Sequence, residues 1–198
     1  MNRVTRAGLI SVLILTWLFV IISCVSAKTF YGQVVDADTK EPIEGAVVVA
    51  YWYKARVTTV GEESLTPKDV KETLTDKNGQ WTITGPKGRT HDLFPYFSTI
   101  TGIYYTKEPE FIIFKPGYCS WPKGFSIGAC KGRMRSEGPG EIMVGKRLEL
   151  PKLTEREDRL RAQSISLAGG ESALEKQREL IRLINEERRN LGLQEIYK

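Results

Sequence analysis

The sequence predicts a mainly β protein, an antiparallel β-sandwich with a C-terminal α-helical extension. As far as residue 151, short runs of β-forming residues alternate with turns rich in glycine, proline and asparagine, and no helical pattern separates them. Beyond that point, apolar residues recur at the spacing of an amphipathic helix. We therefore expect a sandwich over 28–151 and a helical extension over 152–198. A chain of 198 residues suffices for one domain with a buried core.

An export signal or membrane anchor is expected over 1–27. Arg3 and Arg6 form a basic start, an apolar run covers 9–22, and small residues precede Lys28. This order of basic, apolar and small residues is typical of a secretory signal. The rest of the chain is therefore expected to be exported.

Three fates of this segment stay open. The stretch Ile21–Cys24 resembles a bacterial lipobox, which would make Cys24 a lipidated first residue. The small residues that follow also fit an ordinary cleavage site. The chain between Arg6 and Lys28 carries no charge, and it is long enough to cross a bilayer uncleaved. We favour the lipoprotein. Lipoproteins retained at an inner membrane often carry aspartate after the lipidated cysteine, so by resemblance Val25 at that position favours an outer membrane.

The strands follow from local patterns in chain order. Runs of β-forming residues predict strands at 29–35, 46–53, 110–114 and 142–150. The second run is apolar throughout, so both of its faces are expected to be covered. In the last strand four apolar residues share one parity and are expected on one face: Ile142, Val144, Leu148 and Leu150.

A tight turn is predicted at Asp76-Lys77-Asn78-Gly79. Asn-Gly accepts the positive φ angles of a two-residue hairpin loop. The pattern therefore predicts that 73–76 pairs with 80–84, with Trp81 and Ile83 on one face.

Three stretches exceed what a minimal sandwich needs, and we expect them to be loop insertions at 56–70, 85–107 and 119–140. The second is aromatic and includes Tyr96 and Tyr105, whereas the third is basic and rich in glycine. Long loops in compact domains are usually functional or disordered. Binding sites are often carried by loops on a rigid scaffold, so any ligand is expected at these insertions.

The chain has three cysteines, and export leaves Cys119 and Cys130 to pair with each other. A disulfide bond over this spacing stabilises by roughly 2–3 kcal/mol in the loop-entropy model. Two cysteines and the single histidine, His91, do not supply the ligands of a zinc site. We expect no metal and no cofactor.

Positive charge gathers in one part of the chain. The formal net charge is +5, and residues 115–150 hold 7 basic and 3 acidic residues. The basic residues that we group as a patch are Lys123, Lys131, Arg133, Arg135, Lys146 and Arg147. In an exported protein such a patch suits anionic lipid, acidic glycans or acidic proteins. A solvated surface without a partner is an equal alternative, and nucleic acid is not expected.

Two helices are expected in the extension. Thr154 with Glu157 forms a capping box that opens a helix to about 168. A second capping box at Ser172 opens a helix to about 190, and Gly192 is the expected C-cap. One side of the second helix is apolar. We favour its docking on the protein's own sandwich over docking on another chain.

The strand and turn residues resemble a known module, the carboxypeptidase regulatory-like domain. The matched residues are Gly32, Val34, Asp36, Thr39, Pro42, Ile43, Gly45, Ala46, Val48, Thr75, Asp76, Gly79, Trp81, Ile83, Gly117 and Tyr118. The resemblance implies a transthyretin-like sandwich of seven strands. It also implies a non-catalytic accessory module, of the kind attached to secreted peptidases, glycosidases and outer-membrane receptors.

These observations favour a non-enzymatic, membrane-associated protein of the cell envelope that presents loops for binding protein or glycan. Trp121, Tyr96 and Tyr105 are candidate aromatic contacts, although Trp121 is equally explained as a core residue. The candidate basic contacts are Lys123, Lys131, Arg133 and Arg135. Trp52 and Trp81 are expected in the core. A soluble periplasmic or secreted protein, or a single-pass anchored one, remains an alternative location.

Two other function classes stay open. One is an assembly subunit that docks on an envelope complex through its C-terminal helix. The other is a hydrolase, which we favour least. His91 and Asp92 are adjacent, but no G-x-S-x-G nucleophile elbow accompanies them, so no catalytic residue is predicted.

Overall fold

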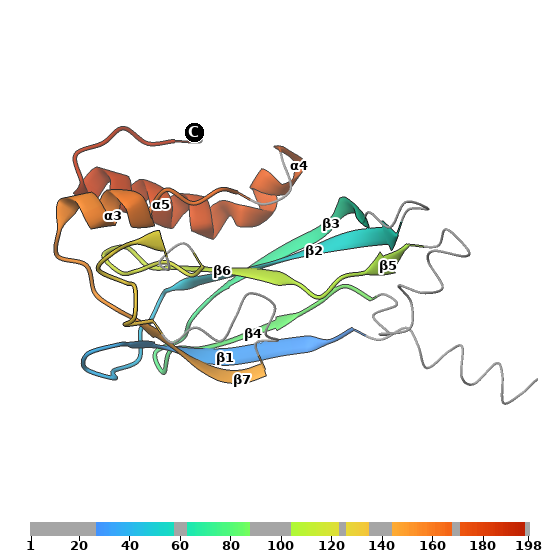
Figure 1. Ribbon diagram of the computed structural model, residues 1–198, viewed down its shortest axis with the longest axis horizontal. Coiled ribbons are helices and arrows are strands. Elements are labelled where there is room, and N and C mark those ends of the chain that lie inside the picture. The colour runs from blue at the N-terminus through green and yellow to red at the C-terminus, as the bar shows by residue number, and fades with distance from the viewer. Residues whose placement is uncertain are drawn as a thin grey trace, which may run out of the picture.

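The computed structural model describes residues 27–57, 63–87, 104–122, 126–134, 144–167 and 171–196. In these residues two sheets are followed by a helical layer (Figure 1). The strands are β1 (Thr29–Asp36), β2 (Val47–Val57), β3 (Glu63–Leu74), β4 (Gln80–Thr84), β5 (Tyr105–Thr106), β6 (Glu110–Phe114) and β7 (Val144–Leu150). The helical elements are α3 (Arg156–Ala162), α4 (Glu171–Leu174), the 3-10 helix η2 (Glu175–Gln177) and α5 (Arg178–Asn190). The mainly β class with C-terminal helices is confirmed.

Several residues named from the sequence lie outside this description. They are Cys24, His91, Asp92, Tyr96, Lys123, Arg135 and Ile142, together with nearly all of the predicted signal. Among the residues described, no helix combines the length and the apolar character needed to cross a bilayer.

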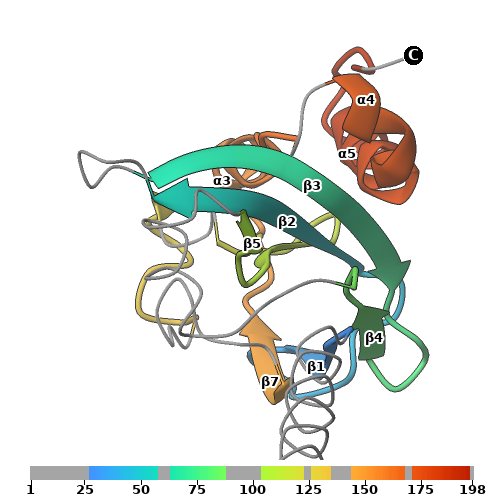
Figure 2. The ribbon, with the colours of Figure 1, turned by 90° about the vertical axis from the view of Figure 1, so that its right-hand side faces the viewer.

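The two sheets form separate layers, seen edge-on in Figure 2. One has the strand order β4-β1-β7, and the other has the order β3-β2-β5 with β6 also paired to β2. The prediction of a wholly antiparallel sandwich is wrong, because β7 runs parallel to β1. Parallel neighbours need a long crossover connection. Between β1 and β7 the chain passes through β2 to β6, and this long connection supplies the crossover.

The turn at 76–79 does not close the predicted hairpin. β3 pairs with β2, whereas β4 pairs with β1, so the turn carries the chain from one sheet to the other. The N–H of Val34 donates to the carbonyl of Gly79 at 2.8 Å, which fastens the turn to β1. The Asp76 carboxylate accepts backbone N–H groups within the turn. Trp81 and Ile83 both face the core, as predicted.

The insertion predicted at 56–70 is largely strand, so that prediction is wrong. β2 and β3 both continue into it as an antiparallel pair. Pro67 lies opposite Tyr53, next to a register shift between the strands. A proline is tolerated there because β3 is the outer strand of its sheet among the described residues. The sequence pattern missed this strand because most of its residues are polar.

Two apolar clusters hold the layers together. The first fills the space between the sheets and includes Trp52 and Trp81, which are 3% and 4% exposed and confirm the core prediction. The second lies between the other face of β2 and the helices, and it includes Val49 and Leu180. The second predicted strand is therefore covered on both faces, as expected.

The C-terminal helix α5 packs on the protein's own sheet, which confirms the favoured interpretation. The helix lies over the sheet that contains β2 and β3 (Figure 1). Leu180, Leu183 and Ile184 are buried in the cluster that joins the helix to this sheet. At the start of α5 the Glu72 carboxylate accepts the N–H groups of Glu179 and Leu180 at 2.8 and 3.1 Å. The apolar stripe is thus covered within the chain and is not available for docking on another protein.

The helix boundaries differ from those predicted. The N-cap residue of α3 is Glu155, which makes no side-chain hydrogen bond to the helix, so the capping box predicted at Thr154 is wrong. The single helix expected from 172 is divided, because Gln177 adopts φ −125° and ψ 33°. Its buried side-chain amide donates to the carbonyl of Ala173, which stabilises this interruption. Gly192 follows α5 with φ +72°, as predicted for the C-cap.

The last strand contains a bulge that changes which residues face the core. Gly145 has φ +68° and lies at a register shift against β1. The extra residue turns Val144 outward, where it is 40% exposed, while Leu148 and Leu150 are buried. The prediction that Val144 shares the apolar face is therefore wrong.

A buried carboxylate ends β1. Asp36 accepts the N–H groups of Asp38 and Thr39 at 2.8 and 3.0 Å, and the Tyr118 hydroxyl also hydrogen-bonds it. Burial alone would raise the pKa of Asp36, but these hydrogen bonds outweigh burial and hold the pKa below the ordinary value of 3.8. The ionised form is thus the one that the fold stabilises.

The substitution Asp36→Asn should cost about 1–3 kcal/mol of stability at neutral pH, because it removes a charged acceptor from this turn. The folded pKa lies below the unfolded one, so the stabilisation is present above pH 3.8 and is lost as the pH falls through the folded pKa. Urea unfolding of both proteins at neutral pH and well below pH 3.8 measures this. A stability difference that does not shrink in acid would contradict it.

Candidate binding groove beside the disulfide loop

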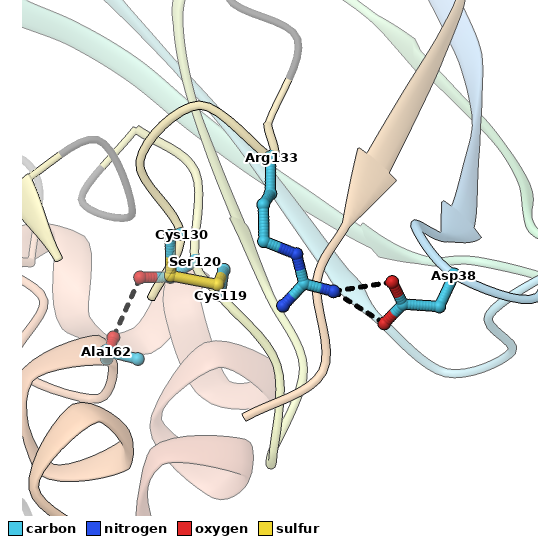
Figure 3. The surroundings of a disulfide bond; sticks show 6 residues. All are labelled: Asp38, Cys119, Ser120, Cys130, Arg133 and Ala162. Carbon is cyan, nitrogen blue, oxygen red and sulfur yellow. Dashed lines mark hydrogen bonds and ion pairs between the residues drawn. A yellow bond between two sulfur atoms is a disulfide. The ribbon is translucent and has the colours of Figure 1, made fainter. Parts of the chain in front are cut away.

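Cys119 and Cys130 form a disulfide bond, as predicted (Figure 3). Both side chains are fully buried in the cluster between the sheets. Ile127 and Met134 are buried with them. The disulfide loop, 119–134, is therefore anchored in the core through these four residues.

Backbone and side-chain hydrogen bonds fix the start of this loop. Trp121 exchanges two backbone hydrogen bonds with Ile113 of β6, at 2.8 and 3.0 Å. The buried Ser120 hydroxyl donates to the carbonyl of Ala162 at the end of α3, at 2.8 Å (Figure 3). The loop is thus held by the sheet on one side and by the helical layer on the other.

A groove of about 450 Å³ lies between the disulfide loop and the chain that follows α3. Its described lining comprises Tyr51, Ile112, Trp121, Pro122, Ser126, Ser164, Ile165 and Ser166. Tyr51 and Ile112 come from the face of the sheet that also carries the helices. The described lining is mostly aromatic or aliphatic, bears serine hydroxyls and contains no charged side chain.

Tyr51 is held in place at one side of the groove. Its hydroxyl donates to a carboxylate oxygen of Glu110 at 2.5 Å, and its ring meets the Tyr53 ring edge-on with centroids 5.7 Å apart. Burial and the Glu110 carboxylate raise the pKa of Tyr51 well above its usual range. The phenol is therefore neutral and oriented at physiological pH.

The structure places the predicted contact residues in different settings. Trp121 lines the groove but is only 8% exposed, so most of its ring belongs to the core. Tyr105 is half-buried in β5, opposite Ala55, and is not among the described lining residues. Lys131 is exposed on the disulfide loop, and Arg133 pairs with both carboxylate oxygens of Asp38 at 2.5 and 2.7 Å (Figure 3).

The described lining residues can contact a ligand but include no pair of groups suited to proton transfer. Its titratable group, Tyr51, has a raised pKa, and its serines have no imidazole or carboxylate among the other lining residues. Within the part of the chain that is described, no group of His, Cys, Asp or Glu side chains could hold a metal ion. The arrangement can bind an uncharged group and donate hydrogen bonds from its hydroxyls.

Most lining residues were not singled out from the sequence. Tyr51 lies in an apolar strand that is expected to be covered, and a covered phenol needs a polar partner. This requirement is a signal that could have singled out Tyr51 as a candidate site residue. The serines at 164–166 follow a helix and carry no distinctive pattern. They reach the groove because α3 ends against the disulfide loop, a contact that the sequence does not reveal.

Fold and groove together define a disulfide-bonded two-sheet protein with a helical layer. A scan of protein-family models and a search of curated proteins find no match. Among solved structures, the chain is similar to the shaft pilin SpaA from Lactobacillus rhamnosus GG. A double mutant of that pilin shares 13% identity over 66% of this chain and 49% of that chain, with a TM-score of 0.32.

A second SpaA structure shares 10% identity over 65% of this chain and 52% of that chain, with a TM-score of 0.28. The chain therefore spans about half the length of these pilin chains. Likeness at this level assigns neither a family nor a function. The resemblance to the carboxypeptidase regulatory-like domain stays a prediction.

Proposed function

We propose that the protein is a non-enzymatic module of the cell envelope that captures a partner protein by inserting one of the partner's apolar side chains into the groove. The observation that carries this proposal is the uncharged, largely apolar lining, held in shape by the disulfide loop and the end of α3. Apolar pockets with a few oriented polar groups are the usual form of a binding site.

The lining favours a polypeptide over a sugar at this position. Ile165 is partly exposed and offers aliphatic surface, which suits an apolar side chain, whereas the Trp121 ring is too deeply buried to serve as an open stacking platform. The hydroxyls of Ser164 and Ser166 stand exposed at the groove, where they can hydrogen-bond a partner's backbone.

Filling the groove should abolish this binding. Ser166→Trp places a large ring in the groove without touching the buried core, because Ser166 is exposed. Selection from a phage-displayed peptide library should enrich apolar peptides on the wild-type protein, and their affinity for the variant should fall at least about tenfold. Isothermal titration with the enriched peptide measures the loss.

Ser64→Trp is the matched control, because Ser64 is exposed on β3 and is not among the lining residues. This variant should bind like the wild-type protein. Equal binding by Ser166→Trp and Ser64→Trp, with both variants folded by circular dichroism, would reject the groove as the site.

We further propose that Cys24 carries a lipid and holds the module at a membrane, by preference an outer membrane. The support is the sequence pattern before Lys28. The intact mass of the protein from the membrane fraction should correspond to a chain that starts at Cys24 and bears acyl groups. A chain that starts at Lys28 would make the protein soluble, and one that keeps Met1 would make it an uncleaved anchor; either mass would refute lipidation.

A further inference from the structure

The outer face of the β4-β1-β7 sheet has no layer over it among the described elements. The helices lie on the opposite sheet, so this face forms the other side of the molecule (Figure 1). It holds a shallow hollow of about 330 Å³ beside Tyr31. The face is distinct from the groove, which lies on the helix side of the other sheet.

Strand register sets two rows of side chains across this face. Tyr31 has Thr82 of β4 and Val144 of β7 as its direct neighbours. Gln33 has Gln80 and Arg147 as its neighbours in the next row. Directly opposed residues in a sheet point to the same side, and rows two residues apart are separated by about 7 Å. An aromatic ring is thus set beside a row of hydrogen-bonding groups.

Tyr31 presents its ring to solvent. It is 48% exposed, among the highest values for a large hydrophobic residue in the described chain. A Cβ added at Gly145 would lie 3.4 Å from a ring carbon of Tyr31, which is an ordinary van der Waals distance. The Tyr31 ring therefore lies beside β7 at the bulge, where Gly145 has φ +68°.

The hollow carries positive charge without a described carboxylate in its lining. Arg147 lies opposite Gln33 and points to this face, whereas Lys146 lies opposite Gly32 and its side chain is directed to the other side of the sheet. The Arg147 guanidinium donates one hydrogen bond to the carbonyl of Lys40 at 3.2 Å, and a guanidinium has five N–H groups. This lining differs from that of the groove, where the described residues bear no charge.

We infer that this sheet face binds an acidic polysaccharide, with a sugar ring stacked on Tyr31 and a sugar carboxylate bound by the Arg147 guanidinium. A pyranose ring has an apolar C–H face that fits an exposed aromatic ring. Its hydroxyls match the amide and hydroxyl groups of Gln33, Gln80 and Thr82. Charge complementarity with the hollow selects the acidic sugar over a neutral one.

Polygalacturonate and its fully methyl-esterified form are suitable probes, because they share a backbone and differ in charge. The wild-type protein should bind the acid form in affinity electrophoresis and should not bind the ester. Tyr31→Ala and Arg147→Gln should each weaken binding by roughly tenfold or more. Tyr104→Ala is the matched control, since Tyr104 is 45% exposed elsewhere, and it should bind normally.

Three results would overturn the inference. Unchanged binding by folded Tyr31→Ala would show attraction by charge alone. Equal binding of the ester would show a neutral glycan site, and equal binding of poly-glutamate would show a site for acidic polypeptide. The groove-filled Ser166→Trp protein should bind polygalacturonate like the wild-type protein, which separates this site from the groove.

Discussion

Replacing Gly79 with alanine is expected to lower the free energy of unfolding by roughly 2–5 kcal/mol. Gly79 has φ +70°, a conformation that costs about 1–2 kcal/mol for a residue with a side chain. An alanine Cβ would also lie 2.3 Å from the backbone oxygen of Val34. That oxygen already accepts the N–H of Ile43, so the clash cannot be relieved by a side-chain movement. Urea unfolding measures the loss.

Gly117→Ala separates the cost of the positive φ angle from the cost of the steric clash. Gly117 has φ +79°, but an added Cβ there meets no atom within 4 Å. We therefore expect this variant to lose only the conformational part, about 1–2 kcal/mol. Equal losses in the two variants would mean that the clash with the Val34 oxygen adds nothing to the cost of the substitution.

This turn shows how far the sequence determines the fold. Asn78-Gly79 correctly predicts a turn with positive φ, because that requirement is local. The choice of β1 rather than β3 as the partner of β4 depends on contacts with Val34, which is distant in sequence. Local patterns therefore located β1, β2, β4, β6 and β7 but missed most of β3 and all of β5, whereas sheet membership followed from tertiary packing.

In β7 and in the groove, too, local patterns predict some features whereas others depend on tertiary packing. The alternation of apolar residues in β7 predicts one buried face, but the bulge at Gly145 moves Val144 to the other side. The groove joins Tyr51, Trp121 and Ser164, which come from three separate segments. Export and the count of cysteines predicted the bond between the two cysteines of the disulfide loop, yet neither predicts which segment lies beside that loop.

The substitution Arg159→Ala should have the second large effect on stability. Arg159 of α3 donates two hydrogen bonds of 2.7 Å to the carboxylate of Glu187 in α5. The Glu187 side chain is 2% exposed, so its charge would be left buried and unpaired. Arg159 is itself 25% exposed, and water can partly replace it, so we expect a loss of about 3 kcal/mol, at the lower end for such pairs. Urea unfolding measures this loss.

Arg161→Ala is the control on the same helix. Arg161 pairs with Glu157 one turn away, and both side chains are more than half exposed, so the expected loss is below about 0.5 kcal/mol. The double variant Arg159→Met, Glu187→Leu should recover most of the stability lost in Arg159→Ala, because no buried charge then remains. A double variant as unstable as Arg159→Ala would show that the cost comes from lost packing of α3 instead.

The pair also bears on binding, because α3 positions one side of the groove. Its last residue, Ala162, accepts the hydrogen bond from Ser120, and the lining serines at 164 and 166 follow directly. Loosening α3 by Arg159→Ala should therefore weaken a groove-binding peptide under conditions where the sandwich remains folded. Binding of polygalacturonate to the opposite sheet should be unchanged in the same variant, since Tyr31 and Arg147 make no described contact with α3.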